Sequence, residues 1–352
     1  MRSNPIKVLI VDDSAVVRKV LTEELSRHPD IRIVGTAVDP FVARDKIVAL
    51  NPEVLTLDLE MPRMDGLSFL ARLMKYRPMP VVVLSSLTPR NSETALKALD
   101  LGAVEVLAKP SSSFSVENLS SALVRAIRAA VTAPIRPLGS APDAGASRPR
   151  LDADLMQTTH KVLAMGASTG GTRALEVVLR RLPPGTCGTV IVQHMPEKFT
   201  CSFARRLDRR CAMAVREAEH NDRVIPGTAL IAPGNRHMLL VREGGNYVVK
   251  IKGGPRVHYQ RPSVDVLFKS VARHAGCNAL GVLLTGMGAD GAVGLLDMRR
   301  RGAFTVAQDE ESCVVFGMPR AAIEKDAVDR VVGLDDIADT VIAHLQQDRQ
   351  AA

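Results

Sequence analysis

The sequence contains no tryptophan, and aromatic residues make up only 3% of its 352 residues. Hydrophobic residues nevertheless account for 46%, so the cores must be built mainly from aliphatic side chains. No apolar run approaches the roughly 20 residues that a membrane-spanning helix needs. The N-terminal stretch also lacks the pattern of a secretory signal peptide. We therefore expect a cytoplasmic protein with no direct membrane insertion.

The cysteines form no recognisable framework. There are five of them, an odd number, all lie in the second half of the chain, and no pair has C-x-x-C spacing: Cys187, Cys201, Cys211, Cys277 and Cys313. This pattern argues against both a disulfide scaffold and a zinc site. Free thiols in a reducing compartment are the expected state.

Basic residues exceed acidic ones, and the net charge is +8. Most of the excess lies in residues 161–352, with clusters around Arg205–Arg210 and Arg299–Arg301. A basic region of this kind is compatible with nucleic acid or with an acidic protein partner. It is equally compatible with the solvent-exposed face of an ordinary helix.

Alternating strand-like and helix-like segments predict two α/β domains joined by a linker. Residues 6–128 contain five such alternations, which is typical of a parallel sheet covered by helices. Residues 131–160 are rich in Pro, Gly, Ala and Ser and indicate a linker. Alternation resumes at residue 161, with shorter strands of expected antiparallel pairing in 213–260. The predicted boundaries are 1–130, 131–160 and 161–352.

Polar residues follow four of the strands predicted in the first half. They are Asp12-Asp13, Asp58, Ser85 and Lys109. Because parallel strands present their carboxyl ends at one edge of a sheet, these side chains are expected to converge. Clustered carboxylates with one lysine suit Mg²⁺ and a phosphoryl group, although Asp13 taken alone fits a helix cap equally well.

These residues make the first half resemble a response-regulator receiver domain over its whole length. The resemblance implies a flavodoxin-like five-stranded parallel sheet, with Asp58 as the phosphoacceptor. It also implies that Asp12, Asp13 and Asp58 hold Mg²⁺, while Ser85 and Lys109 contact the phosphoryl group. One departure is that the fifth strand carries valine where many receivers have an aromatic switch residue.

The hexapeptide Gly166–Gly171, GASTGG, lies between an apolar strand and a predicted helix. A serine between glycines at such a turn matches the G-x-S-x-G pattern of a nucleophile. The same glycines suit a turn that binds phosphate at a helix N-terminus. The first interpretation indicates a hydrolase and the second a nucleotide-binding protein.

Two further motifs end strands of the second half, namely QHMP with His194 and TGMGADG with Asp290. Serine needs an adjacent base, and a histidine oriented by a carboxylate is a suitable one. The Gly-rich turn 286–288 offers main-chain donors for an oxyanion. Taken singly, His194 fits a core histidine and Asp290 fits a cap of the helix beginning near Gly291.

Chain order separates these interpretations. In α/β-hydrolases the order is Ser, Asp or Glu, then His, whereas here Ser168 precedes His194 and Asp290. The late His344 falls in a predicted C-terminal helix. A nucleotide-binding role is weakened because no lysine follows the glycines and the Rossmann spacing is absent. The pattern thus favours a serine hydrolase outside the α/β-hydrolase fold.

The three motifs, placed after a receiver and a linker, closely resemble the chemotaxis protein-glutamate methylesterase family, CheB. The resemblance implies a doubly wound α/β catalytic domain, with Ser168 as nucleophile, His194 as general base and acid, and Asp290 as the orienting carboxylate. The resemblance also implies that Thr169, Met287 and Gly288 support the active site. The resemblance implies that the protein hydrolyses glutamate methyl esters on chemoreceptors and deamidates receptor glutamines. It also implies that these reactions need no metal.

The same resemblance implies the partners. The substrates are the cytoplasmic helices of chemoreceptors, and the phosphodonor is the histidine kinase of the chemotaxis system. No nucleic acid is expected, and the protein is expected to be a monomer. A DNA-binding response regulator is the alternative, because receivers often control such outputs, but the second half is long and α/β in pattern.

Overall fold

The structure is a computed structural model that describes residues 4–61, 63–86, 88–109, 116–134 and 161–350. The chain divides into two compact units, Met1–Asp143 and Ala144–Ala352. The predicted linker falls largely on residues 135–160, outside the described residues. Within the described residues, no helix combines the length and apolarity needed to cross a bilayer. All five cysteines are free thiols.

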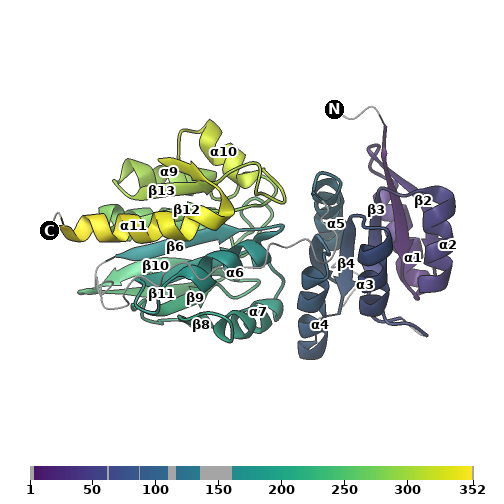
Figure 1. Cartoon of the computed structure of the whole chain (residues 1–352), viewed down its shortest axis with the longest axis horizontal. Helices are drawn as coiled ribbons and strands as arrows, with labels where there is room; N and C mark the ends of the chain where they lie inside the picture. The colour runs from purple at the N-terminus through teal and green to yellow at the C-terminus, as the bar shows by residue number, and fades with distance from the viewer. Residues whose placement is uncertain (1–3, 62, 87, 110–115, 135–160, 351–352) are drawn as a thin grey trace. The chain divides into compact units, whose positions relative to one another are not determined.

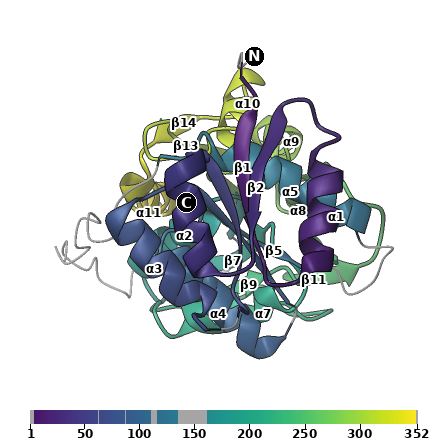
Figure 2. The same cartoon turned by 90° about the vertical axis from the view of Figure 1, so that its right-hand side faces the viewer.

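The first unit is a five-stranded parallel sheet with the strand order β2-β1-β3-β4-β5. Strands β1 and β2 run side by side in Figure 2. Its elements are β1 (Ile6–Val11), α1 (Ala15–Leu25), β2 (Ile31–Ala37), α2 (Pro40–Leu50), β3 (Val54–Asp58), α3 (Gly66–Tyr76), β4 (Val81–Ser85), α4 (Pro89–Asp100), β5 (Glu105–Ala108) and α5 (Val116–Ala130).

Local sequence explains where these elements begin. Asp39 and Asp65 are N-cap residues whose carboxylates accept main-chain N–H groups of the first turns of α2 and α3. Strands β3 and β4 are buried along their whole length, as expected of central parallel strands. The strand order reverses between β1 and β3, the switch point where α/β sheets place their ligands.

The second unit, coloured from teal to yellow in Figure 1, is built around a seven-stranded parallel sheet. Its strand order is β14-β13-β12-β6-β7-β9-β8. Its elements are β6 (Val162–Ala167), α6 (Gly171–Arg181), β7 (Gly188–Gln193), α7 (Phe199–Asp208), β8 (Ala214–Glu217), β9 (Thr228–Ile231), β10 (His237–Glu243), β11 (Asn246–Lys252), α8 (Val264–His274), β12 (Ala279–Leu283), α9 (Ala292–Arg300), β13 (Phe304–Gln308), α10 (Met318–Glu324), β14 (Arg330–Val332) and α11 (Ile337–Gln350).

The helices of this unit form two groups. Helix α6 packs against α7 and α11, whereas α8 packs against α9, which in turn contacts α10. The sheet order changes direction at β6, which pairs with β7 on one side and β12 on the other. The polar motifs that follow β6, β7 and β12 therefore emerge at three adjacent strand ends, at the switch point of the sheet.

The expected antiparallel pairing in 213–260 is right for one hairpin and wrong for two strands. Strands β10 and β11 form a separate antiparallel pair. Strands β8 and β9 instead join the main sheet in parallel. The connection between them contains no helix, so the segment lacks the strand-helix-strand alternation by which parallel pairing is recognised in a sequence.

Two candidate sites at strand ends

The first site lies at the switch point of the N-terminal sheet. Asp12 and Asp58 are almost fully buried, and oxygen atoms of Asp12, Asp13 and Asp58 all lie within 4.8 Å of one another. Ser14, not Asp13, is the N-cap of α1, so capping does not account for Asp13. The structure thus brings together the three carboxylates proposed from the sequence to hold a metal.

Lys109 neutralises part of this charge. Its Nζ lies 2.8 Å from Asp12 Oδ2 and 2.6 Å from Asp58 Oδ2. Burial raises the pKa of Asp58 above its ordinary value, against the opposing effect of Lys109. Burial alone would lower the pKa of Lys109, but the bonds to the two carboxylates outweigh it, and that pKa is raised. The lysine therefore stays charged.

Ser85 is the last residue of β4 and Ser86 follows it, and the surroundings of the two serines differ. Ser86 is engaged by Glu60 and Asn91. Ser85 is fully buried, and its Oγ has no hydrogen-bond partner among the described residues. An orphaned buried hydroxyl beside three oxygen ligands fits a bound anion and a hard cation such as Mg²⁺. The residues present therefore suit a metal-assisted phosphoryl site.

The second site is centred on Ser168, which follows β6 and lies three residues before the start of helix α6. Its main chain is held on both sides: Ser168 N–H donates to Thr285 O at 3.0 Å, and Gln193 Nε2 donates to Ser168 O at 2.9 Å. A Cβ on Gly286 would lie 2.6 Å from that of Ser168. Only glycine permits this approach, which fixes Ser168 against the turn after β12.

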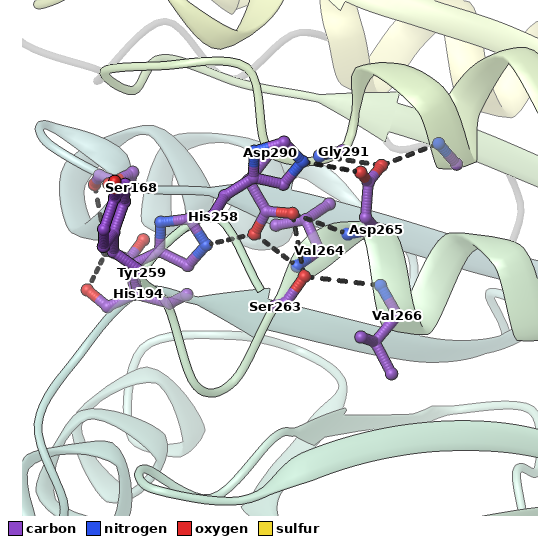
Figure 3. A network of polar contacts seen from close by, with 12 residues as sticks. Ser168, His194, His258, Tyr259, Ser263, Val264, Asp265, Val266, Asp290 and Gly291 are labelled. Atoms are coloured by element: carbon purple, nitrogen blue, oxygen red, sulfur yellow. Dashed lines mark hydrogen bonds and ion pairs between the residues drawn. The ribbon is translucent and has the colours of Figure 1, made fainter. Parts of the chain in front are cut away.

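His194 and Asp290 form a buried pair beside Ser168 (Figure 3). Their side chains are 4% and 2% exposed, and His194 Nε2 lies 2.8 Å from Asp290 Oδ2. His194 Nδ1 is buried and has no hydrogen-bond partner within the part of the chain that the structure describes. One ring nitrogen is therefore occupied by the carboxylate, and the other remains available for a hydroxyl.

Asp290 also serves as a helix cap, but of a different helix from the one expected. Its carboxylate accepts Ser263 Oγ–H and the N–H groups of Val264 and Asp265, at the start of α8. Burial pulls the pKa of Asp290 up, but the bonds from His194 and these donors outweigh it and leave that pKa lowered. The carboxylate that faces His194 is thus held ionised.

Asp265 in turn caps the start of α9. Its Oδ1 accepts the N–H groups of Gly291 and Gly294, at the start of α9, while its Oδ2 lies 3.1 Å from His258 Nε2. The start of α8 is therefore capped by Asp290 from the turn before α9, and the start of α9 is capped by Asp265 from α8 (Figure 3). This exchange fixes the position of Asp290 in space.

The sequence did not single out Asp265, His258 or Gln193 as individual contributors. Ser263 at a helix start, followed by Asp265 in the first turn, is a visible N-terminus signal. The pairing with Asp290 depends on packing between α8 and α9 and has no local signal. Thr169 is buried, and its carbonyl accepts Thr285 Oγ1–H. Met287 and the exposed Gly288 follow Gly286 in the turn.

The late histidine of the chain has a structural setting. His344 lies in α11, and its ring stacks on Phe304 with centroids 4.1 Å apart. The His344 ring is therefore engaged in packing and is not grouped with Ser168. The structure thus groups serine, histidine and aspartate in the chain order Ser168, His194, Asp290.

The arginine clusters are partly neutralised within the fold. Arg206 and Arg210 both donate to the buried carboxylate of Glu176, at 2.7 Å each. Arg299 pairs with Asp326 and Asp329. Much of the positive charge in these clusters is therefore used in ion pairs that link helices and loops.

The Glu176 cluster has a measurable contribution to stability. Replacing Glu176 by glutamine should lower the free energy of unfolding by about 3 kcal/mol, because it removes the buried carboxylate that Arg206 and Arg210 share. For a domain of this size that corresponds to about 10 °C in the midpoint of heat inactivation. Glu324→Gln, which removes the exposed Arg320 pair, should change stability by less than about 0.5 kcal/mol.

The contribution of Glu176 to stability should decrease as the pH falls. The pKa of Glu176 is lowered, because its arginines outweigh burial, so its contribution is present above the ordinary value of 4.5. As pH falls below that value, the wild-type midpoint should approach that of the variant. Equal midpoints at neutral pH would contradict this role.

Two family models match the chain, one described as CheB methylesterase over residues 163–341 and one as response regulator receiver domain over residues 8–122. A protein of Syntrophus aciditrophicus (strain SB) named protein-glutamate methylesterase/protein-glutamine glutaminase 2 is 58% identical over 338 residues, covering 96% of this chain and 98% of that protein. A Bdellovibrio bacteriovorus protein named protein-glutamate methylesterase/protein-glutamine glutaminase is 51% identical, covering 97% and 98%.

A solved structure is also similar to the second unit. The crystal structure of the Thermotoga maritima CheB methylesterase catalytic domain aligns with a TM-score of 0.52 and 36% sequence identity. It covers 53% of this chain and all of that domain.

Proposed function

This chain belongs to the CheB methylesterase family, and from that premise we propose that Ser168, His194 and Asp290 catalyse its reaction. The protein is a receiver-controlled protein-glutamate methylesterase and protein-glutamine glutaminase. The observation that carries the residue assignment is the buried His194–Asp290 pair at 2.8 Å, on strand ends that flank Ser168.

The reaction is an acyl transfer at a side-chain carbonyl. Ser168 Oγ attacks the carbonyl carbon of the glutamyl ester while His194 takes the hydroxyl proton. The tetrahedral intermediate collapses, the C–O bond to methanol breaks, and His194 returns the proton to the leaving oxygen. Water then attacks the acyl-serine by the same route and releases the glutamate. With glutamine the leaving group is ammonia.

His194 Nδ1 is the atom that acts as base. Asp290 is held ionised and lies against Nε2, so the neutral ring carries its proton on Nε2. The lone pair is then on Nδ1, the buried nitrogen that has no hydrogen-bond partner among the described residues. The carboxylate also stabilises the imidazolium that forms after proton transfer.

The oxyanion is stabilised by the main chain. Helix α6 begins three residues after Ser168, so its N-terminal N–H groups and the positive end of its dipole lie beside the reacting carbon. The turn 286–288, packed on Ser168 through Gly286, is the second source of donors. Met287 and Gly288 belong to that turn.

Control comes from the first site, where Asp58 accepts the phosphoryl group. Asp12, Asp13 and Asp58 would hold Mg²⁺. When bound, the metal supplies positive charge that offsets the carboxylates and the incoming phosphoryl oxygens. Lys109 orients Asp58 through its ion pair, and Ser85 offers the hydroxyl without a partner. The phosphodonor is the chemotaxis histidine kinase, and the substrate helices belong to chemoreceptors.

Replacing Asp58 by asparagine should leave basal methanol release within about twofold and remove its stimulation by a small-molecule phosphodonor. The amide cannot form the acyl phosphate, while Ser168 is untouched. Methanol released from methylated receptor membranes, with and without phosphodonor, measures both quantities. Stimulation that persists in the variant would contradict the assignment of Asp58.

The same assay separates the esterase from the DNA-binding alternative. The esterase should release methanol, and gel shifts with duplex DNA should show no salt-dependent binding of comparable strength. DNA binding without methanol release would overturn the proposed function.

A further inference from the structure

A short hairpin, residues 256–261, lies beside the catalytic pair. Val257 and Gln260 exchange two main-chain hydrogen bonds, of 3.0 and 2.8 Å. The two residues between them, His258 and Tyr259, have φ values of 51° and 63°. Such turns normally use Asn and Gly, because bulky residues are strained at positive φ. Two large side chains are thus presented at a strained tip.

The tip is held against the site by His258. One of its ring nitrogens lies within 4.8 Å of carboxylate oxygens of both Asp265 and Asp290. Asp290 in turn contacts His194, so a single carboxylate separates the hairpin from the catalytic ring. Figure 3 shows Tyr259 at the same end of the network as Ser168 and His194. Tyr259 is 72% exposed.

The hairpin and its approach strand carry an excess of positive charge, of which Lys250 is paired with Glu243 just before this segment. Between Gly244 and Val264 the chain has no acidic residue and four basic ones: Lys250, Lys252, Arg256 and Arg261. Arg256 is exposed, and Nη1 donates to Tyr259 O at 3.3 Å. Arg261 donates to Asn235 Oδ1 and Gly254 O. All these acceptors are uncharged.

The electrostatics of Arg256 agree with this geometry. Partial desolvation by the surrounding chain and the neighbouring Arg261 guanidinium lower the pKa of Arg256, although the residue as a whole is exposed. By contrast, Arg206, Arg299 and Arg320 on the same unit each face a carboxylate. Two close guanidiniums held by neutral acceptors favour binding of an anion beside them.

We propose that this hairpin recognises the residues around the esterified glutamate. Arg256 pairs with a carboxylate that lies one helical turn from the ester on the substrate helix. Tyr259 packs on the methylene groups of the esterified glutamate. The inference rests on the proposed function. Residues three and four positions apart lie on one face of a helix. A helix that presents its ester to Ser168 would therefore bring a neighbouring acidic side chain to the hairpin.

The test compares two synthetic helical peptides that carry one glutamate methyl ester. In one peptide, the residues three and four positions before and after the esterified glutamate are glutamate. In the other peptide, these residues are glutamine. The full chain with phosphodonor should hydrolyse the glutamate-flanked peptide with about tenfold higher kcat/KM. Arg256→Gln should reduce this ratio to about one, Arg256→Glu should invert it, and Arg256→Lys should retain part of it. Added salt should reduce the wild-type ratio.

Arg330→Glu is the matched control, because Arg330 is an exposed arginine on β14, the edge strand opposite β8. It should keep the wild-type ratio. A wild-type ratio near one, or equal losses on both peptides in Arg256→Gln and Arg256→Lys, would overturn the proposal. Failure of the proposed function would look different, since the wild-type chain would then release methanol from neither peptide, or a Ser168→Ala variant would still release it.

Discussion

Replacement of Ser168 by alanine is expected to lower methanol release from methylated receptor membranes by at least about 10⁴-fold, whether or not phosphodonor is present. Without the hydroxyl, no acyl-enzyme forms, and His194 has no proton to accept. The loss is larger than any regulatory effect, because phosphorylation acts on an active site that must first be intact.

Two controls separate loss of chemistry from loss of structure. Ser168→Ala should still accept a phosphoryl group on Asp58, which lies in the other unit. Ser202→Ala, which removes a partly buried hydroxyl from α7, should retain the wild-type rate. Methanol release that survives in Ser168→Ala would show that another group is the nucleophile.

Replacement of Asp290 by asparagine is expected to lower the rate by about 10⁴-fold, the size seen when a triad carboxylate becomes an amide. The side chain keeps its shape, and a carbonyl oxygen at the Oδ1 position can still accept Ser263 Oγ–H and Asp265 N–H, although Val264 N–H loses its acceptor. The NH₂ group then faces His194 Nε2, which becomes the acceptor. The ring proton moves to Nδ1, so the base facing Ser168 is lost.

Asp265→Asn is the matched control for this prediction. Asp265 has a similar burial and caps α9, but it contacts His258 rather than His194. Its replacement should cost less than about tenfold in methanol release. If both variants lost activity equally, Asp290 would act only through helix packing.

Much of the fold and site could be predicted because the relevant signals are local. Apolar runs ending in Asp12, Asp58, Ser168 and His194 mark buried parallel strands, and such strands bring their carboxyl ends together. The sequence therefore predicted both polar clusters. It also predicted that one cluster belongs to a receiver domain and the other to a hydrolase domain. The exact domain boundaries around residues 131–160 remain predictions.

The features that escaped prediction depend on packing between distant segments. The parallel pairing of β8 and β9 has no crossover helix to signal it. The exchange of caps joins Asp265 on α8 to Asp290 in the turn before α9. Arg206 belongs to a basic run in the sequence, yet its charge is bound by Glu176 on α6. Composition alone cannot distinguish such an arginine from one that is free to bind a partner.

The most direct test of the catalytic arrangement is the position of the imidazole proton on His194. Nitrogen-15 NMR of the full chain, labelled in histidine, reports the tautomer of each neutral ring. The arrangement described here predicts a proton on Nε2 and a bare Nδ1 in the wild type, and the reverse tautomer in Asp290→Asn. A wild-type ring protonated on Nδ1 would contradict it, because no lone pair would then face the Ser168 hydroxyl.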